Sequence, residues 1–538
     1  MSQNLLFRQF GCDAILCPPG TFHPFGAATM ESGCRPCPAS DEDEDHNPPL
    51  NRILGRLECP SVEFVHGDLD GDGHLSQMEI LRLLWTNTIG NNWGAQFMKW
   101  ADPRSDPCEL NGITCVNGNI AKIDLTDAAM CSNGDRKQGP VKDCHGLPSE
   151  LSLLTHLEIL TMNRRQFLHG TLPSEFGHLT KLKYLDIGAC PNMVGTIPSE
   201  LGRLANMKIL NLAGCRFTGS TPEEFWEMTN MEKLHMSMNL ITGTLSTKIG
   251  KLSNMKELMW SRSQLSGPIP EEIGQVAALE NLELYGNQFT GTIPSSVGNC
   301  SNLKRIGKHS MVRFVTCRQN MRCLTRTLED LFNNELVGPL PESLTRLTSL
   351  QILHVKLNRL TGTIPAGFGD LPFLTWFDVS SNELHGTIPE SFASSRSIKD
   401  FRLGGNMIYD PIPQALCANT NINGGLTRQY GCAGVICPLG TYSDPGHATH
   451  SEGCKPCPEG TNTLYLGSSS CEKVSDADIL AIFFNVMGGA TWNAIQKNHW
   501  KDPEGDDVCT WNGITCDENG ELLSIRFPLL GLDDPDFT

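Results

Sequence analysis

Several features that define other protein classes are missing from this chain of 538 residues. No apolar run is long enough to span a bilayer, so we expect no membrane span here, although a longer gene product could carry one. Basic residues are in deficit, 42 against 60 acidic ones, which gives a net charge of −18. This balance argues against nucleic acid or an anionic membrane as the main partner.

Catalytic signatures are missing too. The chain has no nucleophile elbow, no phosphate-binding loop and no kinase motif. We therefore do not expect an enzyme.

Cysteine, in contrast, is abundant. Twenty-two cysteines in spaced clusters indicate disulfides and an oxidising compartment. The start, MSQNLLFRQFGC, nevertheless has neither the basic nor the apolar region of a signal peptide. Both observations fit a secreted or cell-surface protein whose gene model is incomplete.

The middle of the chain repeats a Gly-Thr-Ile-Pro turn at intervals of 24 or 25 residues, with one interval of 47. Such a period indicates a solenoid, in which stacked units bury a shared core. The turn positions are Pro173, Pro198, Pro222, Ser246 in place of proline, Pro270, Pro294, Pro341, Pro365, Pro389 and Pro413.

One repeat, LENLELYGNQFTGTIP from Leu279 to Pro294, shows which residues of a unit predict its strand and its turn. Its L-x-x-L-x-L pattern predicts a short strand with Leu282 and Leu284 on one face. A buried amide at Asn287 could satisfy backbone groups where the coil turns. The same asparagine recurs at Asn239, Asn334, Asn358, Asn382 and Asn406.

These residues resemble the plant-specific class of leucine-rich repeat over roughly residues 145–416. The resemblance implies an α/β fold, a solenoid with a parallel sheet on its concave face, flanked by disulfide-rich modules and helical caps. The turn spacing gives about ten repeats, and the interval of 47 indicates a basic, non-repeat insertion at 307–329. Our preferred interpretation of the insertion is a retained intron, and the alternative is a loop at the sheet edge.

A larger duplication flanks the repeats. Residues 8–38 return at 428–458 with the same cysteine spacing, and the surrounding segments predict Cys-rich modules at 8–40 and 417–471. They resemble ephrin-receptor-like or growth-factor-receptor-like Cys-rich repeats. An acidic, Pro-containing linker follows the first module at 41–60. A second cap and the start of another repeat array are expected at 475–538.

Residues 80–125 resemble the N-terminal cap of plant leucine-rich-repeat receptors, and both copies end in NGITC. The resemblance implies one disulfide in each cap, between Cys108 and Cys115 and between Cys509 and Cys516. Plant-type repeats combined with these modules look like predicted surface proteins of microalgae such as diatoms.

Within 61–80, the run DLDGDGHLSQMEI matches the EF-hand calcium loop. The alternative is an acidic turn that caps the next helix. The EF-hand resemblance predicts calcium as a cofactor, with ligands from Asp68, Asp70, Asp72, the backbone carbonyl of His74, Ser76 through water, and Glu79.

Outward positions of the repeated strands should form two columns on the concave face. We expect His235 and His354 there as exposed residues, four repeats apart once the insertion is left out and too distant to share a metal. Tyr285 and Phe332 are candidate anchors. The ligand-binding candidates are His235, Met259, Glu283, Tyr285, Phe332, His354, Lys356, Asp378 and Arg402.

The sequence therefore predicts an extracellular or cell-surface recognition protein. Its partner would be a protein, peptide or glycan bound on the concave face, with calcium held before the cap. The alternative is a structural or adhesive cell-wall protein with no signalling role.

Overall fold

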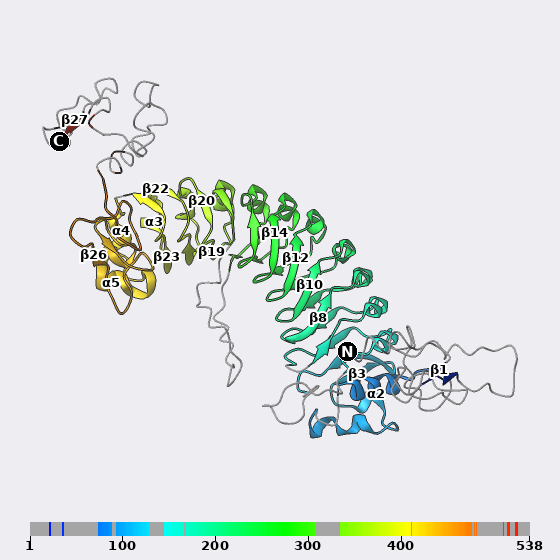
Figure 1. The fold of residues 1–538 in the computed structure, drawn as a ribbon. Helices are drawn as coiled ribbons and strands as arrows, with labels where there is room; N and C mark the ends of the chain where they lie inside the picture. Colours follow the sequence, from blue (N-terminus) through cyan, green and yellow to red (C-terminus); the bar gives the residue numbers. More distant parts are fainter. Residues whose placement is uncertain are drawn as a thin grey trace, which may run out of the picture. The chain divides into compact units, whose positions relative to one another are not determined.

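The structure is a computed structural model that divides into two compact units, Met1–Met207 and Lys208–Thr538 (Figure 1). The residues it describes are 21–22, 35–36, 74–88, 93–128, 145–165, 168–307, 334–409, 411–475, 478, 480, 509, 514–516 and 522–525. Most of the first Cys-rich module, the linker 41–60, most of the 307–329 insertion and most of the second cap lie outside these residues.

The first unit contains a helical cap built around tryptophan. Helix α2 (Gln77–Asn87) buries an apolar face that includes Ile80, Leu81 and Leu84. Trp93 packs edge-on against Trp85 and Trp100 with ring centroids 5.1 Å apart. The indole N–H groups of Trp93 and Trp100 donate to the backbone carbonyls of Thr88 and Asn111. Buried indoles with satisfied N–H groups make this cap a small core of its own.

Strands of the first unit follow directly from the cap. β3 (Ile113–Val116) pairs antiparallel with β4 (Asn119–Asp124), which pairs parallel with β5 (Ile159–Thr161), and β5 pairs parallel with β7 (Tyr184–Asp186). β6 (His169–Gly170) pairs parallel with β8 (Asn192–Thr196). The short 3-10 helices of this unit are η4 (Ala95–Ala101), η5 (Pro107–Glu109), η6 (Ser149–Leu153), η7 (Ser174–His178) and η8 (Ser199–Arg203).

In the second unit, one strand per coil lines the inner side of the bend (Figure 1). These strands are parallel and hydrogen-bonded in chain order. They are β9 (Ile209–Asn211), β11 (Lys233–His235), β13 (Glu257–Met259), β15 (Asn281–Glu283), β17 (Arg305–Ile306), β19 (Ile352–His354), β21 (Trp376–Asp378) and β23 (Asp400–Arg402).

Each coil of the second unit adds a second, lateral strand. β10 (Arg216–Ser220), β12 (Leu240–Thr244), β14 (Gln264–Pro268) and β16 (Gln288–Thr290) form one parallel set. β18 (Val337–Pro339) pairs with β20 (Arg359–Thr361), and β22 (His385–Thr387) pairs with β24 (Met407–Tyr409). The α/β solenoid predicted from the repeats is thus confirmed.

The prolines of the repeated turn stand at the start of the short helices. Pro294 is the N-cap of η12, with φ −59°, because its ring fixes the angle that the start of the turn requires. Ser246, at the position without proline, caps through its hydroxyl, which accepts from the Lys248 N–H.

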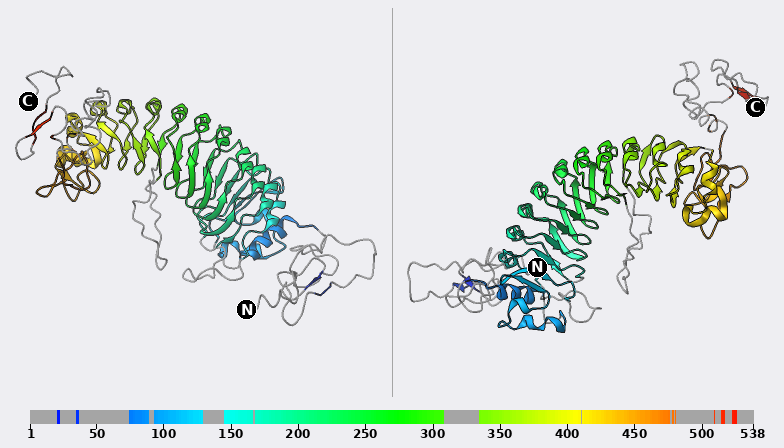
Figure 2. Two further views of the ribbon diagram at one scale, coloured as in Figure 1. Left: turned by 45° about the horizontal axis from the view of Figure 1, so that its top comes forward. Right: turned by 180° about the vertical axis from the view of Figure 1, so that it is seen from behind.

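These helices follow the outer side of the second unit in both views of Figure 2. They are η9 (Glu223–Glu227), η10 (Thr247–Lys251), η11 (Glu271–Gln275), η12 (Ser295–Asn299), η14 (Glu342–Arg346), η15 (Ala366–Phe368), α3 (Ser391–Ser394) and α4 (Gln414–Ala418).

The asparagine column forms the predicted ladder. The Asn287 side chain donates to the backbone carbonyls of Trp260, one coil earlier, and Leu284, and it accepts from the Leu265 N–H. Such bonds satisfy backbone groups inside the stack, where no water reaches them.

A Cys-rich module follows the last coil. It contains η16 (Ile422–Gly425), α5 (Leu426–Tyr430), η17 (Gly431–Gly434) and a ribbon of β25 (Thr441–Tyr442) and β26 (Lys455–Pro456). Its disulfides join Cys417 to Cys432, Cys437 to Cys454 and Cys457 to Cys471. Farther along the chain, β27 (Ile514–Cys516) pairs antiparallel with β28 (Leu522–Ile525).

Candidate functional site

The candidate site is the concave ledge of the second unit, which we define as the first and third positions of its eight inner strands and the position two residues after each strand. The middle residue of each strand points into the core; Leu234, Leu258 and Leu353 are fully buried. The first and third side chains must then face away from the core. Parallel register places residues from consecutive coils side by side along the ledge.

The early part of the ledge is a cluster of paired charges. The Glu257 carboxylate lies 2.8 Å from the Lys233 amine and 3.0 Å from Nε2 of His235. The hydrogen bond from His235, helped by Lys233, lowers the pKa of Glu257 to about 2, although partial burial acts in the opposite direction. Glu257 therefore stays ionised down to strongly acidic pH.

A row of alternating charges runs beside the ledge. The Glu232 carboxylate contacts the amines of Lys208 at 3.2 Å and Lys256 at 2.8 Å, and Lys304 contacts Glu280 at 2.6 Å. Since these groups are partly exposed, each pair contributes little energy by itself. Together they fix the positions of the side chains along this edge.

The middle of the ledge is less polar. Met259 and Tyr285 are half-buried, whereas Glu283 is buried with 8% exposure. Burial, more than any nearby charge, raises the pKa of Tyr285. Gly307 follows β17 and occupies the ledge position between Glu283 and His354, so this coil presents no side chain there.

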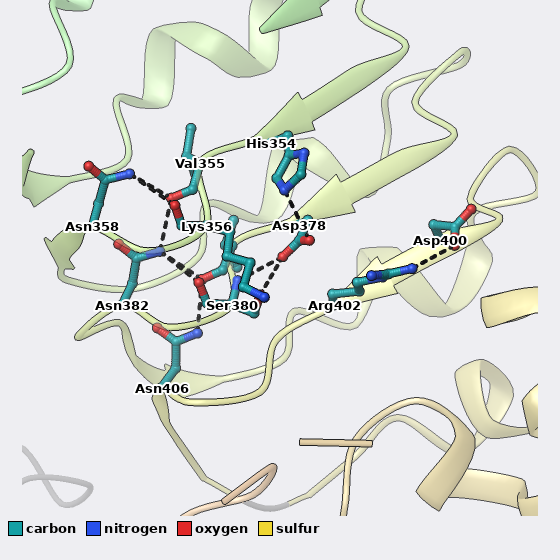
Figure 3. A network of polar contacts seen from close by, with 11 residues as sticks. His354, Val355, Lys356, Asn358, Asp378, Ser380, Asn382, Asp400, Arg402 and Asn406 are labelled. Carbon is teal, nitrogen blue, oxygen red and sulfur yellow. Dashed lines mark hydrogen bonds and ion pairs between the residues drawn. The ribbon is translucent and has the colours of Figure 1, made fainter. Parts of the chain in front are cut away.

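A buried histidine–aspartate pair dominates the late part of the ledge (Figure 3). Nε2 of His354 lies 3.2 Å from Oδ2 of Asp378, and the two side chains are only 3% and 2% exposed. Oδ1 of Asp378 accepts from the Ser380 hydroxyl at 2.6 Å and from the Ser380 N–H. The expectation that His354 is an exposed surface residue was wrong, because contact with the neighbouring coil buries it.

The charge on Asp378 is stabilised by its neighbours. Burial by itself would raise the pKa of Asp378, but hydrogen bonds from His354 and Ser380, with the charge of Arg402, bring the pKa below its ordinary value. A buried carboxylate with these partners remains ionised.

Trp376 holds this part of the ledge together. His354 stacks on the indole with a centroid distance of 6.0 Å, and the Arg402 guanidinium lies 5.2 Å from the ring centroid. Arg402 also contacts Asp400 at 3.6 Å. Stacking and cation–π attraction of this kind order long side chains at little cost.

The Cys-rich module reaches the same region. His447 of the module is buried, and burial lowers its pKa. The charges of Arg402, Asp378 and Asp400 act on its imidazole. The late ledge is thus built by the repeats and the module together.

Two further residues, Lys356 and Phe332, were predicted to lie on the ledge. Lys356 is half-buried and lies beside the His354–Asp378 pair (Figure 3). Phe332, the second candidate anchor, lies outside the described residues.

The predicted calcium loop is described only at its end. Asp68, Asp70 and Asp72 lie outside the described residues, and His74 is exposed. Oε2 of Glu79 accepts from the Ser76 N–H at 2.8 Å, and the Ser76 hydroxyl accepts from the Glu79 N–H at 3.3 Å, which is a capping box for α2. Among the described residues, no group of three or more His, Cys, Asp or Glu side chains could hold a metal ion.

Cap cysteines are paired in both copies. Cys108 bonds to Cys115 with their Cα atoms 5.5 Å apart, and Cys509 bonds to Cys516 with a Cα distance of 5.6 Å. The side chains of Cys190, Cys215 and Cys300, in the repeats, are all buried. The disulfides in the caps and in the second Cys-rich module fit an oxidising, extracellular location.

Sequence profiles of two domain types match the chain. The "Leucine rich repeat N-terminal domain" matches residues 83–116 and 489–517, which cover the two caps. The "Leucine Rich Repeat" matches residues 206–228, 278–300 and 373–395. The repeats match leucine-rich repeats and are similar to those of plant receptor ectodomains. No curated protein sequence matches this chain significantly.

Among solved structures, the repeats resemble the ectodomain of the plant membrane receptor kinase GASSHO1/SCHENGEN3 from Arabidopsis thaliana, in complex with CASPARIAN STRIP INTEGRITY FACTOR 2. The TM-score is 0.52 and the identity 26%, over 64% of this chain and 37% of the ectodomain.

Two other receptors give lower scores and add nothing to the fold assignment. They are the peptide hormone receptor RGFR1 (27% identity, 52% and 44% covered, TM-score 0.43) and the Arabidopsis receptor kinase HAESA (24% identity, 65% and 61% covered, TM-score 0.47). The chain spans less than two thirds of each of these three proteins.

No helix among the described residues is long and apolar enough to cross a membrane.

The positions of the ledge residues were predictable from the 24-residue period, but the contacts between their side chains were not predicted. One signal was available: Lys233 and Glu257, like His354 and Asp378, are 24 residues apart and therefore neighbours in adjacent coils.

Proposed function

We propose that this protein is an extracellular or cell-surface recognition protein that binds a peptide or protein on the concave ledge of its second unit. The ledge itself carries the proposal, because its side chains are held in fixed positions by contacts between coils. Preorganised side chains lose little entropy when a ligand binds. The GASSHO1/SCHENGEN3 ectodomain, which shares the fold, was solved in complex with a named factor.

Met259, Tyr285 and Lys356 are the proposed ligand contacts. All three are half-buried, so each offers surface to a partner while its base is supported. His354, Asp378 and Arg402 have a different role, because His354 contacts the Asp378 carboxylate and both His354 and Arg402 pack on Trp376. We infer that they support the ledge from below.

The test uses synthetic peptide and glycan arrays as probes, with the whole chain as analyte. We expect binding to a subset of the peptides, with at least a tenfold loss for Lys356→Glu and for Met259→Arg. Arg359→Glu is the matched control, since it makes the same charge change three residues away, on the exposed first position of β20. Retained binding in both ledge variants, or equal loss in the control, contradicts the proposal. Binding to glycans alone would contradict a peptide or protein ligand and would indicate a glycan ligand instead.

A structural or adhesive role is the alternative, and one observation favours it. The charges around Glu232 and Glu257 are already paired between coils, which stiffens the array without any ligand. This role would be favoured if no peptide or glycan bound, or if the ledge variants bound as well as the wild type.

We also propose that residues 68–79 bind calcium. Hard oxygen ligands at alternate positions suit this ion, and Glu79 occupies the start of α2, where the last ligand of such a loop belongs. Glu79→Gln is the informative variant, because glutamine keeps the capping box but cannot act as a bidentate carboxylate. Calorimetry with calcium chloride should show a binding isotherm that this variant weakens at least tenfold. Glu109→Gln, in η5 of the cap, should leave the isotherm unchanged.

A further inference from the structure

The chain contains one acceptor run for N-linked glycosylation. Asn299, Cys300 and Ser301 form it, and no other asparagine of the sequence is followed at the second position by serine or threonine. Such a run offers a side-chain amide as the acceptor and a hydroxyl two residues later, with a middle residue other than proline. Short runs of this kind arise by chance, so the fold must show whether the acceptor faces solvent.

The acceptor run lies at the end of a short helix on the outer side of the second unit. Asn299 is the last residue of η12, and Cys300 is its C-cap. Asn299 and Ser301 are exposed, whereas Cys300 is fully buried. Both groups that glycosylation requires therefore lie on the surface, and the residue between them is held in the core.

The repeat supplies internal comparisons for the Asn299 position. Seven other coils place an exposed residue there: His178, Arg203, Glu227, Lys251, Gln275, Arg346 and Asp370. The next residue is buried in all seven: Leu179, Leu204, Met228, Leu252, Val276, Leu347 and Leu371. Side chains of either charge and of very different length occupy the outer position, so the fold has room for a large substituent there.

Cys300 is a core residue of this coil. Its Sγ donates to the backbone carbonyl of Ile273, one coil earlier, at 3.5 Å. Burial raises the pKa of the Cys300 thiol to about 11, so the thiol stays protonated at neutral pH. A residue held in this way fixes the direction in which its neighbour Asn299 points outward.

The Asn299 amide is not used by the fold. Asn302, three residues later, donates to the Ala277 carbonyl at 3.0 Å, and Glu227 and Lys251, at the Asn299 position of two earlier coils, pair at 2.8 Å. Among the described residues, the Asn299 side chain has no such partner. A substituent on its nitrogen therefore breaks no contact between coils.

We propose that Asn299 carries an N-linked glycan on the outer side of the second unit. This proposal rests on the extracellular or cell-surface location proposed above, which the disulfides of the caps and the module support. The donor is an oligosaccharide linked to a polyisoprenyl diphosphate. A bond forms between Nδ2 of Asn299 and the anomeric carbon of the sugar, and the bond from that carbon to the diphosphate oxygen breaks. Nδ2 loses one proton, the lipid diphosphate leaves, and no group is oxidised or reduced.

A glycan at Asn299 lies on the side of the second unit opposite the ledge. The inner strands line one side of the coils, and the short helices, including η12, follow the other (Figure 2). Hydrated sugar around η12 keeps these outer helices from packing against another protein. The concave ledge stays open to its ligand.

Expression of the whole chain in insect cells, behind a cleaved secretion signal, tests the proposal. Digestion with peptide-N-glycosidase in heavy-oxygen water should convert Asn299 to a labelled aspartate, seen by peptide mapping, and should shift the protein by one step on a gel. Asn299→Gln and Ser301→Ala should each remove the shift. Ser301→Thr keeps the hydroxyl and should retain it, as should the control Asn302→Gln. Equal urea midpoints for Asn299→Gln and the unchanged chain would exclude misfolding as the cause.

The preceding coil provides a second test. Gln275→Asn with Ala277→Ser, added to Asn299→Gln, moves the acceptor run to the equivalent position and should restore the shift. Secreted protein in which the Cys417–Cys432 bond has formed but Asn299 is unmodified overturns the glycan alone. Protein that folds only with these cysteines reduced overturns the extracellular location, and the glycan with it.

Discussion

Asp378 shows at the scale of one residue how this solenoid keeps charge on its inner face. The carboxylate is buried, yet its neighbours favour the ionised form. His354 lies in the coil before and Arg402 in the coil after, and Ser380 follows Asp378 by two residues. Its neighbour Trp376 orders both flanking side chains. Ledge residues thus differ in role according to burial, although the repeat places them in equivalent positions.

The buried pair should contribute more to stability than the half-exposed one. His354→Ala leaves Asp378 buried with fewer partners, so we expect a loss of about 3 kcal/mol in the free energy of unfolding. His235→Ala should cost about 1 kcal/mol or less, because Glu257 keeps Lys233 and contacts water. Urea denaturation of both variants measures the difference. Equal losses would show that burial of the first pair has no energetic consequence.

The lowered pKa of Glu257 predicts that the free energy of unfolding depends on pH. Its pKa in the folded state, about 2, is below the ordinary value of 4.5. A lowered folded pKa stabilises the protein above the unfolded value, and this contribution disappears as the pH falls from about 4.5 towards 2. Glu257→Gln should therefore lower the free energy of unfolding at pH 7 by at most about 3 kcal/mol. The difference from wild type should shrink steadily in urea titrations below pH 4.5; a constant difference would contradict the assignment.

At the scale of the element, each coil is fixed by one proline and one asparagine. The proline begins a short helix, and the asparagine bonds backbone groups of its own coil and the one before. The ladder is not uniform, since Cys215 and Ser263 stand where asparagine is expected. Other contacts must therefore secure those two coils.

Asn382 tests the ladder. Its side chain donates to the carbonyls of Val355 and Val379 and accepts from the Leu360 N–H. Asn382→Ala leaves these buried groups without partners, and we expect a loss of about 3 kcal/mol. Hydrogen exchange at the Leu360 amide should accelerate with it. Asn358→Ala, at a half-buried site, should cost less.

At the scale of the molecule, the solenoid needs closed ends more than a large core. Coils contact mainly their neighbours, so the terminal coils determine whether leucines meet water. The tryptophan cap covers the start of the repeats in the first unit, and the Cys-rich module covers the last coil in the second. Three disulfides stabilise that module, which has few apolar residues to bury.

Opening the link between module and last coil should destabilise the end of the array first. Cys417→Ser with Cys432→Ser removes a bond that closes a loop of 15 residues, for which we expect a loss of about 3 kcal/mol. Hydrogen exchange should show lower protection in β23 and β24 than in β11 and β13. A uniform change along the array would instead mean that the coils unfold as one unit.

The repeat period was strong enough to predict the fold, the ladder and the ledge positions. It could not predict which ledge residues are buried, because burial depends on the neighbouring side chains. His354 was expected on the surface for this reason. Phe332 and the aspartates of the calcium loop lie outside the described residues, so their roles stay predictions.

The sequence by itself determined the solenoid, because leucines and asparagines spaced 24 residues apart can be buried only when coils stack in register. It also determined the cysteine-rich composition of the ends. Only the tertiary structure decided which charges face one another across coils and that the second module belongs to the array before it. Those outcomes depend on distances between side chains and backbones that the order of residues along the chain does not specify.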